Sequence, residues 1–219
     1  MKNQAGEIVY TPPQDAKVIL DLMANLEQYI NNDDIDDSDY LVKMAIIHFQ
    51  FESIHPFYDG NGRTGRIINI LYLFYKGLLD YPILYLSRYI IKNKKSYYEL
   101  LQGVRDKGIW EDWILFILEG VITTSKETIE TINAIRLLMN EFKLTIKDKL
   151  PIIYSKDLLE NLFKHPYTKI EFLQKDIGKS IQTTSIYLEK LVEIGLLEKM
   201  KFKNSNYYIN IKLFNLFTQ

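Results

Sequence analysis

Apolar residues recur at helical spacing over most of the chain, which predicts a mainly α-helical protein. The predicted helices cover residues 15–30, 40–53, 87–105 and 110–142. The last is longer than ordinary globular helices, so we expect a bend or break in it. A further helix runs from residues 61–63 to Gly77 and is expected to bury Ile67, Ile68, Leu71 and Phe74. The acidic residues 31–39 are expected to form a solvated loop.

The pattern changes after residue 144. Helical spacing over residues 155–163, 169–177 and 182–194 is followed by β-prone residues 196–200 and 207–211 around a polar turn. Three helices and a hairpin are typical of a winged helix. Residues 145–219 contain 12 lysines, no arginine and 8 acidic residues, a net charge of +4, whereas the preceding 144 residues sum to −5. We therefore expect two domains, residues 1–144 and 145–219.

Composition narrows the class of protein. Hydrophobic residues make up 47% of the 219 residues, which is typical of a folded globular chain. A net charge of −1 gives no overall field toward nucleic acid or acidic membranes. There are no cysteines, which excludes disulfides and thiolate metal sites and fits a reducing compartment. With no signal peptide or membrane-spanning run in the sequence, we expect a cytoplasmic protein without membrane contact.

The candidate chemistry lies in residues 55–66, which read His-Pro-Phe-Tyr-Asp-Gly-Asn-Gly-Arg-Thr-Gly-Arg. His55 can accept a proton near neutral pH, and Asp59 offers hard oxygen ligands to Mg²⁺. Gly60 and its neighbours allow backbone N–H groups to approach an anion. Arg63 and Arg66 are three residues apart, so on a helix they share a face and can bind phosphates. Together these residues predict a nucleoside triphosphate site.

Other motifs fit this stretch less well. Residues 60–65 match G-x-G-x-x-G, but the preceding residues 39–53 have helical spacing where a dinucleotide fold requires a strand. A P-loop would need a lysine and a hydroxyl where Arg66 and Ile67 stand. A calcium loop would need a glutamate at Ile70. A plain surface turn explains the glycines, but it explains neither the histidine nor the two arginines.

The stretch resembles the signature of Fic-domain proteins, His-x-Phe-x-Asp/Glu-Gly-Asn-Gly-Arg-x-x-Arg. Every defined position matches, at His55, Phe57, Asp59, Gly60, Asn61, Gly62, Arg63 and Arg66. The resemblance implies a Fic-type helical bundle with a small β-flap at about residues 6–13. It also implies transfer of AMP from ATP to a Tyr, Thr or Ser hydroxyl of a target protein, with release of pyrophosphate.

The resemblance assigns roles residue by residue. His55 is implied as the base, Asp59 as the Mg²⁺ ligand, and Phe57 as the side chain that anchors the loop in the core. The implied nucleotide-binding residues are Gly60, Asn61 and Gly62 around the α-phosphate, Arg63 and Arg66 on the departing phosphates, and Tyr97 and Tyr98 beside the adenine. For the two tyrosines, ordinary helix packing is an equally good alternative. The target segment would pair as an added strand with the flap residues Ile8, Val9, Tyr10 and Thr11.

Many Fic proteins carry an inhibitory Ser/Thr-x-x-x-Glu followed by Gly or Asn. Here Thr128 follows Glu127 and Lys190 follows Glu189, so both candidate stretches depart from that pattern. An inhibitor is therefore expected as a separate partner or as a segment preceding the given chain. His48, among apolar residues, is expected to be a core histidine.

Two alternatives stay open. The chain could be a nucleic-acid-binding regulator whose Fic domain is secondary, with Gln182, Thr183, Thr184 and Tyr187 facing a DNA groove. The charge of the C-terminal region is a weak footprint for this, and winged helices also dock proteins. Transfer of another group, such as UMP or phosphate, also stays open. Gly62 argues against phosphate, because phosphate-transferring relatives have lysine there.

Overall fold

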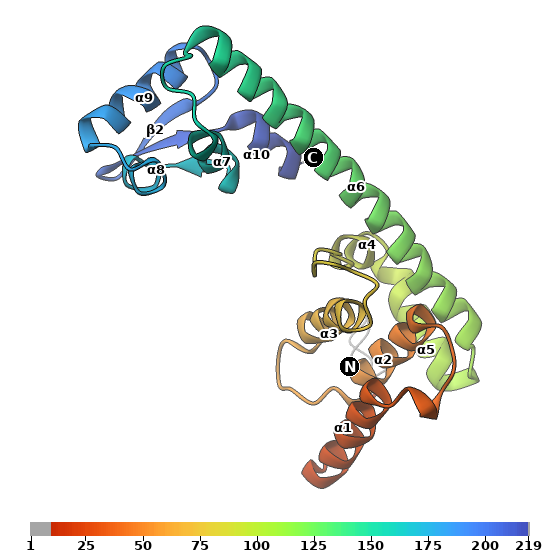
Figure 1. The fold of residues 1–219 in the computed structure, drawn as a ribbon. Coiled ribbons are helices and arrows are strands. Elements are labelled where there is room, and N and C mark those ends of the chain that lie inside the picture. The colour runs from red at the N-terminus through yellow and green to blue at the C-terminus, as the bar shows by residue number, and fades with distance from the viewer. Residues whose placement is uncertain (1–9, 219) are drawn as a thin grey trace. The chain divides into compact units, whose positions relative to one another are not determined.

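The computed structural model describes residues 10–218, and their contacts divide the chain into two compact units, residues 1–128 and 129–219. Both are mainly helical, as the apolar spacing predicts (Figure 1). Each unit has its own hydrophobic core. None of the helices within residues 10–218 is long and apolar enough to cross a membrane.

The first unit is built around one deeply buried helix, α2. In chain order its elements are α1 (Ala16–Asn31), the 3-10 helix η1 (Asp33–Ile35), α2 (Tyr40–Ile54), α3 (Asn61–Tyr75), α4 (Ser87–Lys92), α5 (Lys94–Lys107) and the start of α6 (Trp110–Lys149). Asp39 begins α2 by accepting the Leu41 N–H at 2.8 Å. The buried indole of Trp113 donates to the Ala45 carbonyl at 2.9 Å, which fastens α6 to α2.

Two helical predictions need correction. Residues 87–105 form two helices, α4 and α5, because the chain departs from helical geometry at Asn93, whose side chain donates to the Tyr89 carbonyl at 2.9 Å. The predicted break in the long helix is wrong, since α6 is one helix of 40 residues. Its early residue Trp113 lies in the first core and its late residue Phe142 in the second. A helix shared by two cores can exceed the usual length.

The face of α3 that turns inward is not the one expected. Ile67, Leu71 and Phe74 are about half exposed, with 54%, 52% and 47% of their surface accessible. The buried residues of α3 are instead Asn61, Gly65, Asn69, Tyr72 and Leu73. They follow the same helical spacing on the opposite side, so the periodicity was sound and the choice of face was wrong.

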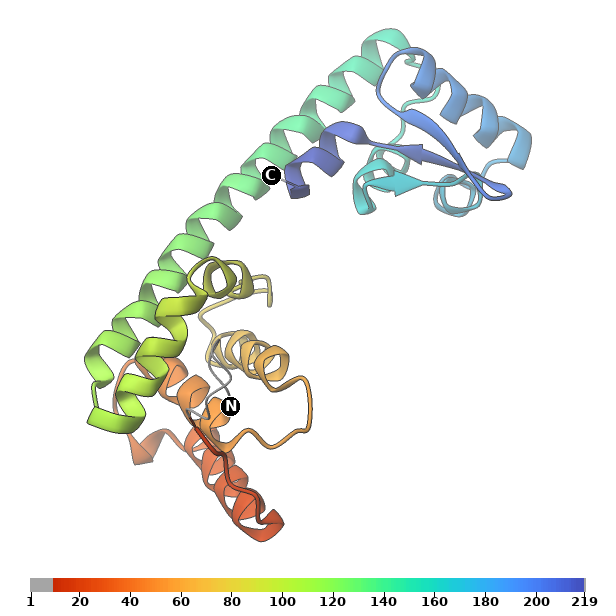
Figure 2. The same ribbon diagram turned by 180° about the vertical axis from the view of Figure 1, so that it is seen from behind.

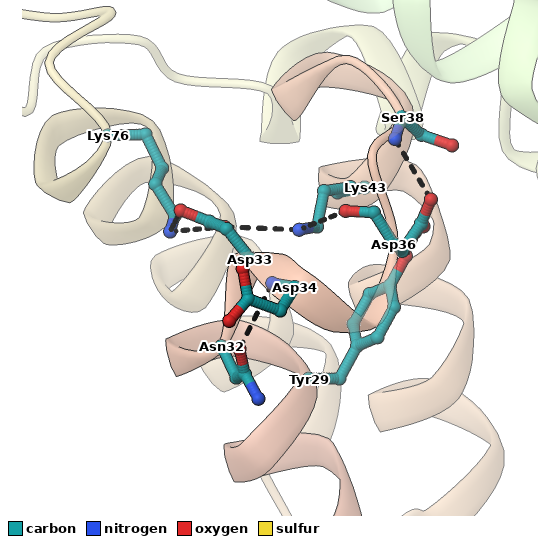
Figure 3. A network of polar contacts seen from close by, with 8 residues as sticks. All are labelled: Tyr29, Asn32, Asp33, Asp34, Asp36, Ser38, Lys43 and Lys76. Carbon is teal, nitrogen blue, oxygen red and sulfur yellow. Dashed lines mark hydrogen bonds and ion pairs between the residues drawn. The ribbon is translucent and has the colours of Figure 1, made fainter.

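The acidic segment before α2 is largely exposed, as expected, and its Asp33 also forms ion pairs with two lysines (Figure 3). Lys43 Nζ is buried and lies 3.1 Å from Asp33 Oδ1 and 3.0 Å from the Asp36 carbonyl oxygen. Lys76, just after α3, reaches the same Asp33 oxygen at 2.7 Å. The Tyr29 hydroxyl donates to Asp36, and this hydrogen bond, together with those from Ser38, lowers the pKa of Asp36 to about 2. The Asp33 carboxylate thus pairs with both lysines and ties η1 to α2 and to the end of α3.

The second unit has the element order expected of a winged helix. After α6 come α7 (Lys156–Lys164), β1 (Tyr167–Thr168), α8 (Ile170–Ile177), α9 (Ile181–Glu193), β2 (Glu198–Phe202), β3 (Ser205–Ile209) and α10 (Ile211–Thr218). The predicted hairpin is confirmed as β2 and β3, and β1 pairs with the other edge of β3. The short strand β1 and the terminal helix α10 were not predicted. Leu188 and Tyr208 lie in the buried core.

Candidate active site

The signature motif spans the loop of residues 55–60, which joins α2 to α3, and the first turns of α3 (Figure 2). His55 directly follows α2, and its N–H still donates to the Phe51 carbonyl at 2.9 Å. Its backbone lies in the left-handed region, at φ 51° and ψ 54°. This conformation is unfavourable for a non-glycine residue and persists where the surroundings hold it in place, as at active sites.

The surroundings of His55 favour a neutral imidazole. Burial lowers the pKa of His55, and the positive charge of Arg105 lowers it further, against the backbone of Glu52, which acts to raise it. The ring is half-buried and not sealed from solvent. A neutral imidazole at neutral pH can accept a proton, which is what a general base requires.

Asn61 holds the loop in shape. Its side chain is 2% exposed, accepts the Phe57 N–H at 2.9 Å and donates to the Phe57 carbonyl at 2.6 Å. Phe57 itself is 49% exposed, and its ring centre lies 6.3 Å from that of the buried Phe51, so the ring contacts the core on one side only. The amide of Asn61 adds to this anchor by bonding the Phe57 backbone. With its side chain engaged in this way, Asn61 has its backbone N–H to offer to a phosphate.

Replacing Asn61 by Ala is expected to destabilise the first unit by about 1–3 kcal/mol, because the partly buried N–H and carbonyl of Phe57 both lose their partner. Urea unfolding followed by circular dichroism measures the change. Asn31→Ala is the matched control, since Asn31 is exposed and its side chain donates to the Glu27 carbonyl of its own helix at 2.9 Å. Equal stability of the two variants would contradict the anchoring role.

The start of α3 can receive an anion. Gly60 precedes the helix at φ 88°, a conformation that favours glycine, and no side chain of residues 10–218 caps the helix there. The first N–H groups of a helix and its dipole attract negative charge. Gly62 lies in this first turn, so its N–H belongs to the same set.

The two motif arginines have different partners. Arg63 Nη2 lies 3.1 Å from Asp59 Oδ2, and both side chains are largely exposed. Asp59 Oδ1 also accepts the Gly60 N–H at 2.7 Å. Arg66 is partly buried, and its Nε donates to the Ser87 hydroxyl at 2.7 Å. Ser87 was not singled out in the sequence, but as the first residue of α4 it fixes the direction of the Arg66 side chain.

Glu52 is a second residue that sequence reasoning missed. It is 4% exposed, burial raises the pKa of its carboxyl, and the charges of Arg66 and Arg105 oppose that shift. A Cβ at Gly65 would lie 2.9 Å from Glu52 Oε1, so glycine is required for α3 to approach α2 this closely. A lone glutamate within an apolar helix was the signal that could have pointed to it.

The described end of the predicted flap is fastened beside His55. The Tyr10 hydroxyl donates to the Ser53 carbonyl at 2.8 Å, and the Arg105 guanidinium carbon lies 3.7 Å from the centre of the Tyr10 ring. Arg105 Nη2 also donates to the Ser53 hydroxyl at 3.2 Å. Tyr10 and Thr11 are not in a strand, and Ile8 and Val9 lie outside the described residues.

The two tyrosines proposed for adenine have unequal access. Tyr97 is 4% exposed, and its hydroxyl lies 3.0 Å from His48 Nε2 in the core. Packing is therefore the better interpretation for Tyr97, while Tyr98 keeps half of its surface accessible. His48 is fully buried and stacks on Trp113, and burial lowers its pKa to about 4. The prediction of a core histidine is confirmed.

Glu127 and Glu189 belong to the two stretches that depart from the inhibitory pattern. Both glutamates pair with residues other than Arg66. Glu127 lies 3.5 Å from Lys92, and Glu189 accepts from Lys199 at 2.6 Å and from the Tyr208 hydroxyl at 2.7 Å. In the helix suggested for DNA, Thr184 is fully buried and cannot face a groove. Tyr187 is partly buried against the second core. Of that set, Gln182 is the residue with an exposed side chain.

Three comparisons with known proteins agree with this geometry. The Fic/DOC family profile matches residues 2–73, and the profile of the C-terminal domain of SoFic-like protein adenylyltransferases matches residues 138–213. A Fido domain-containing protein of Dictyostelium discoideum is 42% identical over 80 residues, which cover 36% of this chain and 53% of that protein. The protein adenylyltransferase Fic of Drosophila erecta is 28% identical over 118 residues, covering 54% and 22%.

A probable protein adenylyltransferase of Aquifex aeolicus is 36% identical over 100 residues, which cover 46% of this chain and 28% of that protein. The chain thus spans between about a fifth and about half of these relatives. The crystal structure of a Fic family protein from Desulfovibrio desulfuricans shares the fold, with a TM-score of 0.52 at 21% identity over 95% of this chain and 59% of that one. Residues 2–73 of the chain are thus similar to the Fic/DOC family, and residues 138–213 are similar to the C-terminal domain of SoFic-like protein adenylyltransferases.

Proposed function

We propose that this chain transfers AMP from ATP to a hydroxyl side chain of a target protein. The observation that carries the proposal is the position of His55. It ends α2 in a strained conformation, a few residues before the uncapped start of α3. A base beside an anion site is what nucleotidyl transfer to a weak nucleophile needs. The protein adenylyltransferases to which the chain is similar support the same reaction.

In this reaction the hydroxyl oxygen forms a bond to the α-phosphorus of ATP, and the bond from that phosphorus to the oxygen bridging the β-phosphate breaks. His55 accepts the hydroxyl proton, and pyrophosphate leaves with the bonding electrons. Backbone N–H groups at the start of α3 stabilise the charge on the α-phosphate. Arg66, directed by Ser87, and Arg63 bind the departing phosphates.

Asp59 fits the role of Mg²⁺ ligand. Its carboxylate is exposed and stands directly before the anion site. Mg²⁺ is commonly bound by one or two carboxylates together with substrate phosphates, so a single carboxylate at this place is sufficient on the protein side. When bound, Mg²⁺ would neutralise charge on the phosphates. Arg63 would then leave its ion pair with Asp59 and turn to the nucleotide.

The transferred group is tested with ATP labelled at either end. The purified chain, Mg²⁺ and a cell lysate are incubated with α-labelled or γ-labelled ATP, and the labelled proteins are analysed by mass spectrometry. Protein label is expected from α-labelled ATP alone, with the mass of AMP on a Tyr, Thr or Ser. Self-modification is also expected, because within residues 10–218 Arg66 is hydrogen-bonded to a neutral serine and forms no ion pair with a carboxylate that would keep it from the γ-phosphate. Label from γ-labelled ATP would show phosphate transfer and contradict the proposal.

A further inference from the structure

The outer face of the small sheet is apolar and aromatic, where a solvent-facing sheet surface is ordinarily polar. Met200 pairs directly with Tyr207, and Tyr167 with Ile209, so their side chains share one face. Met200 is 53% exposed, and Phe202, two residues along the same strand, is 58% exposed. The other face of the sheet carries the buried residues of the core. The exposed rings therefore lie on the face of the sheet that does not pack against the core.

The three rings of this face and Phe172 of α8 form a connected row, which we call the aromatic platform: Tyr167, Phe172, Phe202 and Tyr207. The ring centres of Tyr167 and Tyr207 are 5.5 Å apart, and those of Phe202 and Tyr207 are 6.3 Å apart. Phe172, at the start of α8, extends the row at 6.5 Å from Tyr167. The row thus runs from β2 across β3 and β1 to a neighbouring helix.

Two lysine side chains lie over rings of the platform. Lys169 Nζ lies 4.4 Å from the centre of the Tyr207 ring and 5.6 Å from that of Phe172. Lys203, in the hairpin turn, lies 5.7 Å from the Phe202 ring. Glu198 shares this face with Met200 and Phe202, and Glu171 is nearby in sequence, while Lys199 and Lys201 alternate onto the other face of the sheet. The platform therefore combines exposed ring faces with two lysines that lie directly on the rings.

This combination suits a ligand that carries both flat rings and negative charge. Exposed aromatics that stack bases, beside cations that contact phosphates, are how sheets bind single-stranded nucleic acid. The groove-facing helix of a winged helix is a poorer candidate here. The exposed residues of α9 include Ile181 and Ile186 and one basic residue, Lys190, opposed by Glu193. We propose that the aromatic platform binds single-stranded DNA or RNA by stacking its bases, with Lys169 and Lys203 contacting the phosphates.

The test measures fluorescence anisotropy of the full chain with 12-nucleotide labelled oligo-dT, oligo-rU and a 12-base-pair duplex. Tyr167→Ser and Phe202→Ser are each expected to weaken single-strand binding about 10-fold, because each removes a stacking surface. Lys169→Gln should lower the slope of log affinity against log salt by about 0.7, the effect of one lost phosphate contact. The two single strands distinguish DNA from RNA as the source of the shared chemistry.

Ile186→Ser is the matched control, an exposed apolar residue on α9 outside the platform, and it should leave single-strand binding unchanged. Circular dichroism confirms that every variant is folded. Binding to the duplex alone, and its loss in Ile186→Ser, would overturn the proposal in favour of α9. Absence of binding to any of the three nucleic acids would overturn it as well and leave the platform as a protein-docking surface.

Discussion

Replacement of His55 by Ala is expected to lower AMP transfer by roughly 10²–10⁴-fold, the usual cost of losing a general base. ATP binding should persist, because the imidazole acts on the hydroxyl of the target while the arginines and the start of α3 hold the phosphates. Transfer is measured with α-labelled ATP and binding by calorimetry. A loss of transfer at unchanged affinity is the expected signature of a residue that acts in the chemical step.

The chain supplies a matched control for this variant. Its three histidines are His48, His55 and His165, and His165 is exposed in the second unit. His165→Ala should transfer AMP as the unchanged chain does. Because His55 adopts a left-handed backbone, His55→Gly is a second variant that relieves the strain while removing the base. Full turnover in either His55 variant would remove this residue from the mechanism.

The environment of His55 also sets the expected pH dependence. Its pKa is lowered below the ordinary value of 6.5, mainly by burial, and the charge of Arg105 adds to the effect. The neutral, proton-accepting form therefore predominates above the lowered pKa and is lost as pH falls through it. We expect the acidic limb of kcat/KM to lie below pH 6.5, and Arg105→Gln to shift that limb upward. An acidic limb above 6.5 would contradict the assigned cause.

The candidate site was readable in the sequence because its residues are contiguous. Helical spacing before and after the glycines placed the motif between two helices, and the structure confirms α2, the loop and α3 there. Partners distant along the chain could not be read in this way. Ser87 reaches Arg66 across 21 residues and Arg105 reaches Ser53 across 52, and no periodicity or motif links either pair.

The orientation of α3 shows a different limit. Its sequence has apolar residues on two sides, and hydrophobicity favours the side with Ile67, Leu71 and Phe74. The structure buries the side with Gly65 because a residue without a side chain lets α3 lie directly on Glu52 and Phe51 of α2. Close approach between backbones decided which face is covered, and apolar periodicity carries no information about it.

The charge pattern of the sequence and the packing of the structure place the start of the second domain at different residues. The change in lysine content places a boundary at residues 144–151, whereas the contacts divide the chain after Thr128. Phe142 is fully buried in the second core, with its ring 5.2 Å from that of Phe163. Leu138 is also buried there, and Ile135 and Met139 pack against the same core. The last turns of α6 are thus one wall of the second unit.

We therefore expect a fragment of residues 129–219 to fold cooperatively and a fragment of residues 145–219 to be largely unfolded. The shorter fragment loses Leu138 and Phe142. Truncating one buried leucine to alanine costs about 2–5 kcal/mol, and one buried phenylalanine about 3–5 kcal/mol. Their sum approaches or exceeds the whole stability of a small domain, about 5–15 kcal/mol. Circular dichroism and urea unfolding of the two fragments measure the difference.

Two adjacent leucines on α6 provide the matched control within the longer fragment. Leu138 is 8% exposed and Leu137 is 72% exposed, so they share chemistry and helix position but not burial. Leu138→Ala should lower the free energy of unfolding by about 2–5 kcal/mol, and Leu137→Ala should leave it nearly unchanged. An equal urea midpoint for residues 145–219 and residues 129–219 would contradict this prediction. The domain boundary would then lie where the charge changes, and the second core would not need the residues of α6 for its stability.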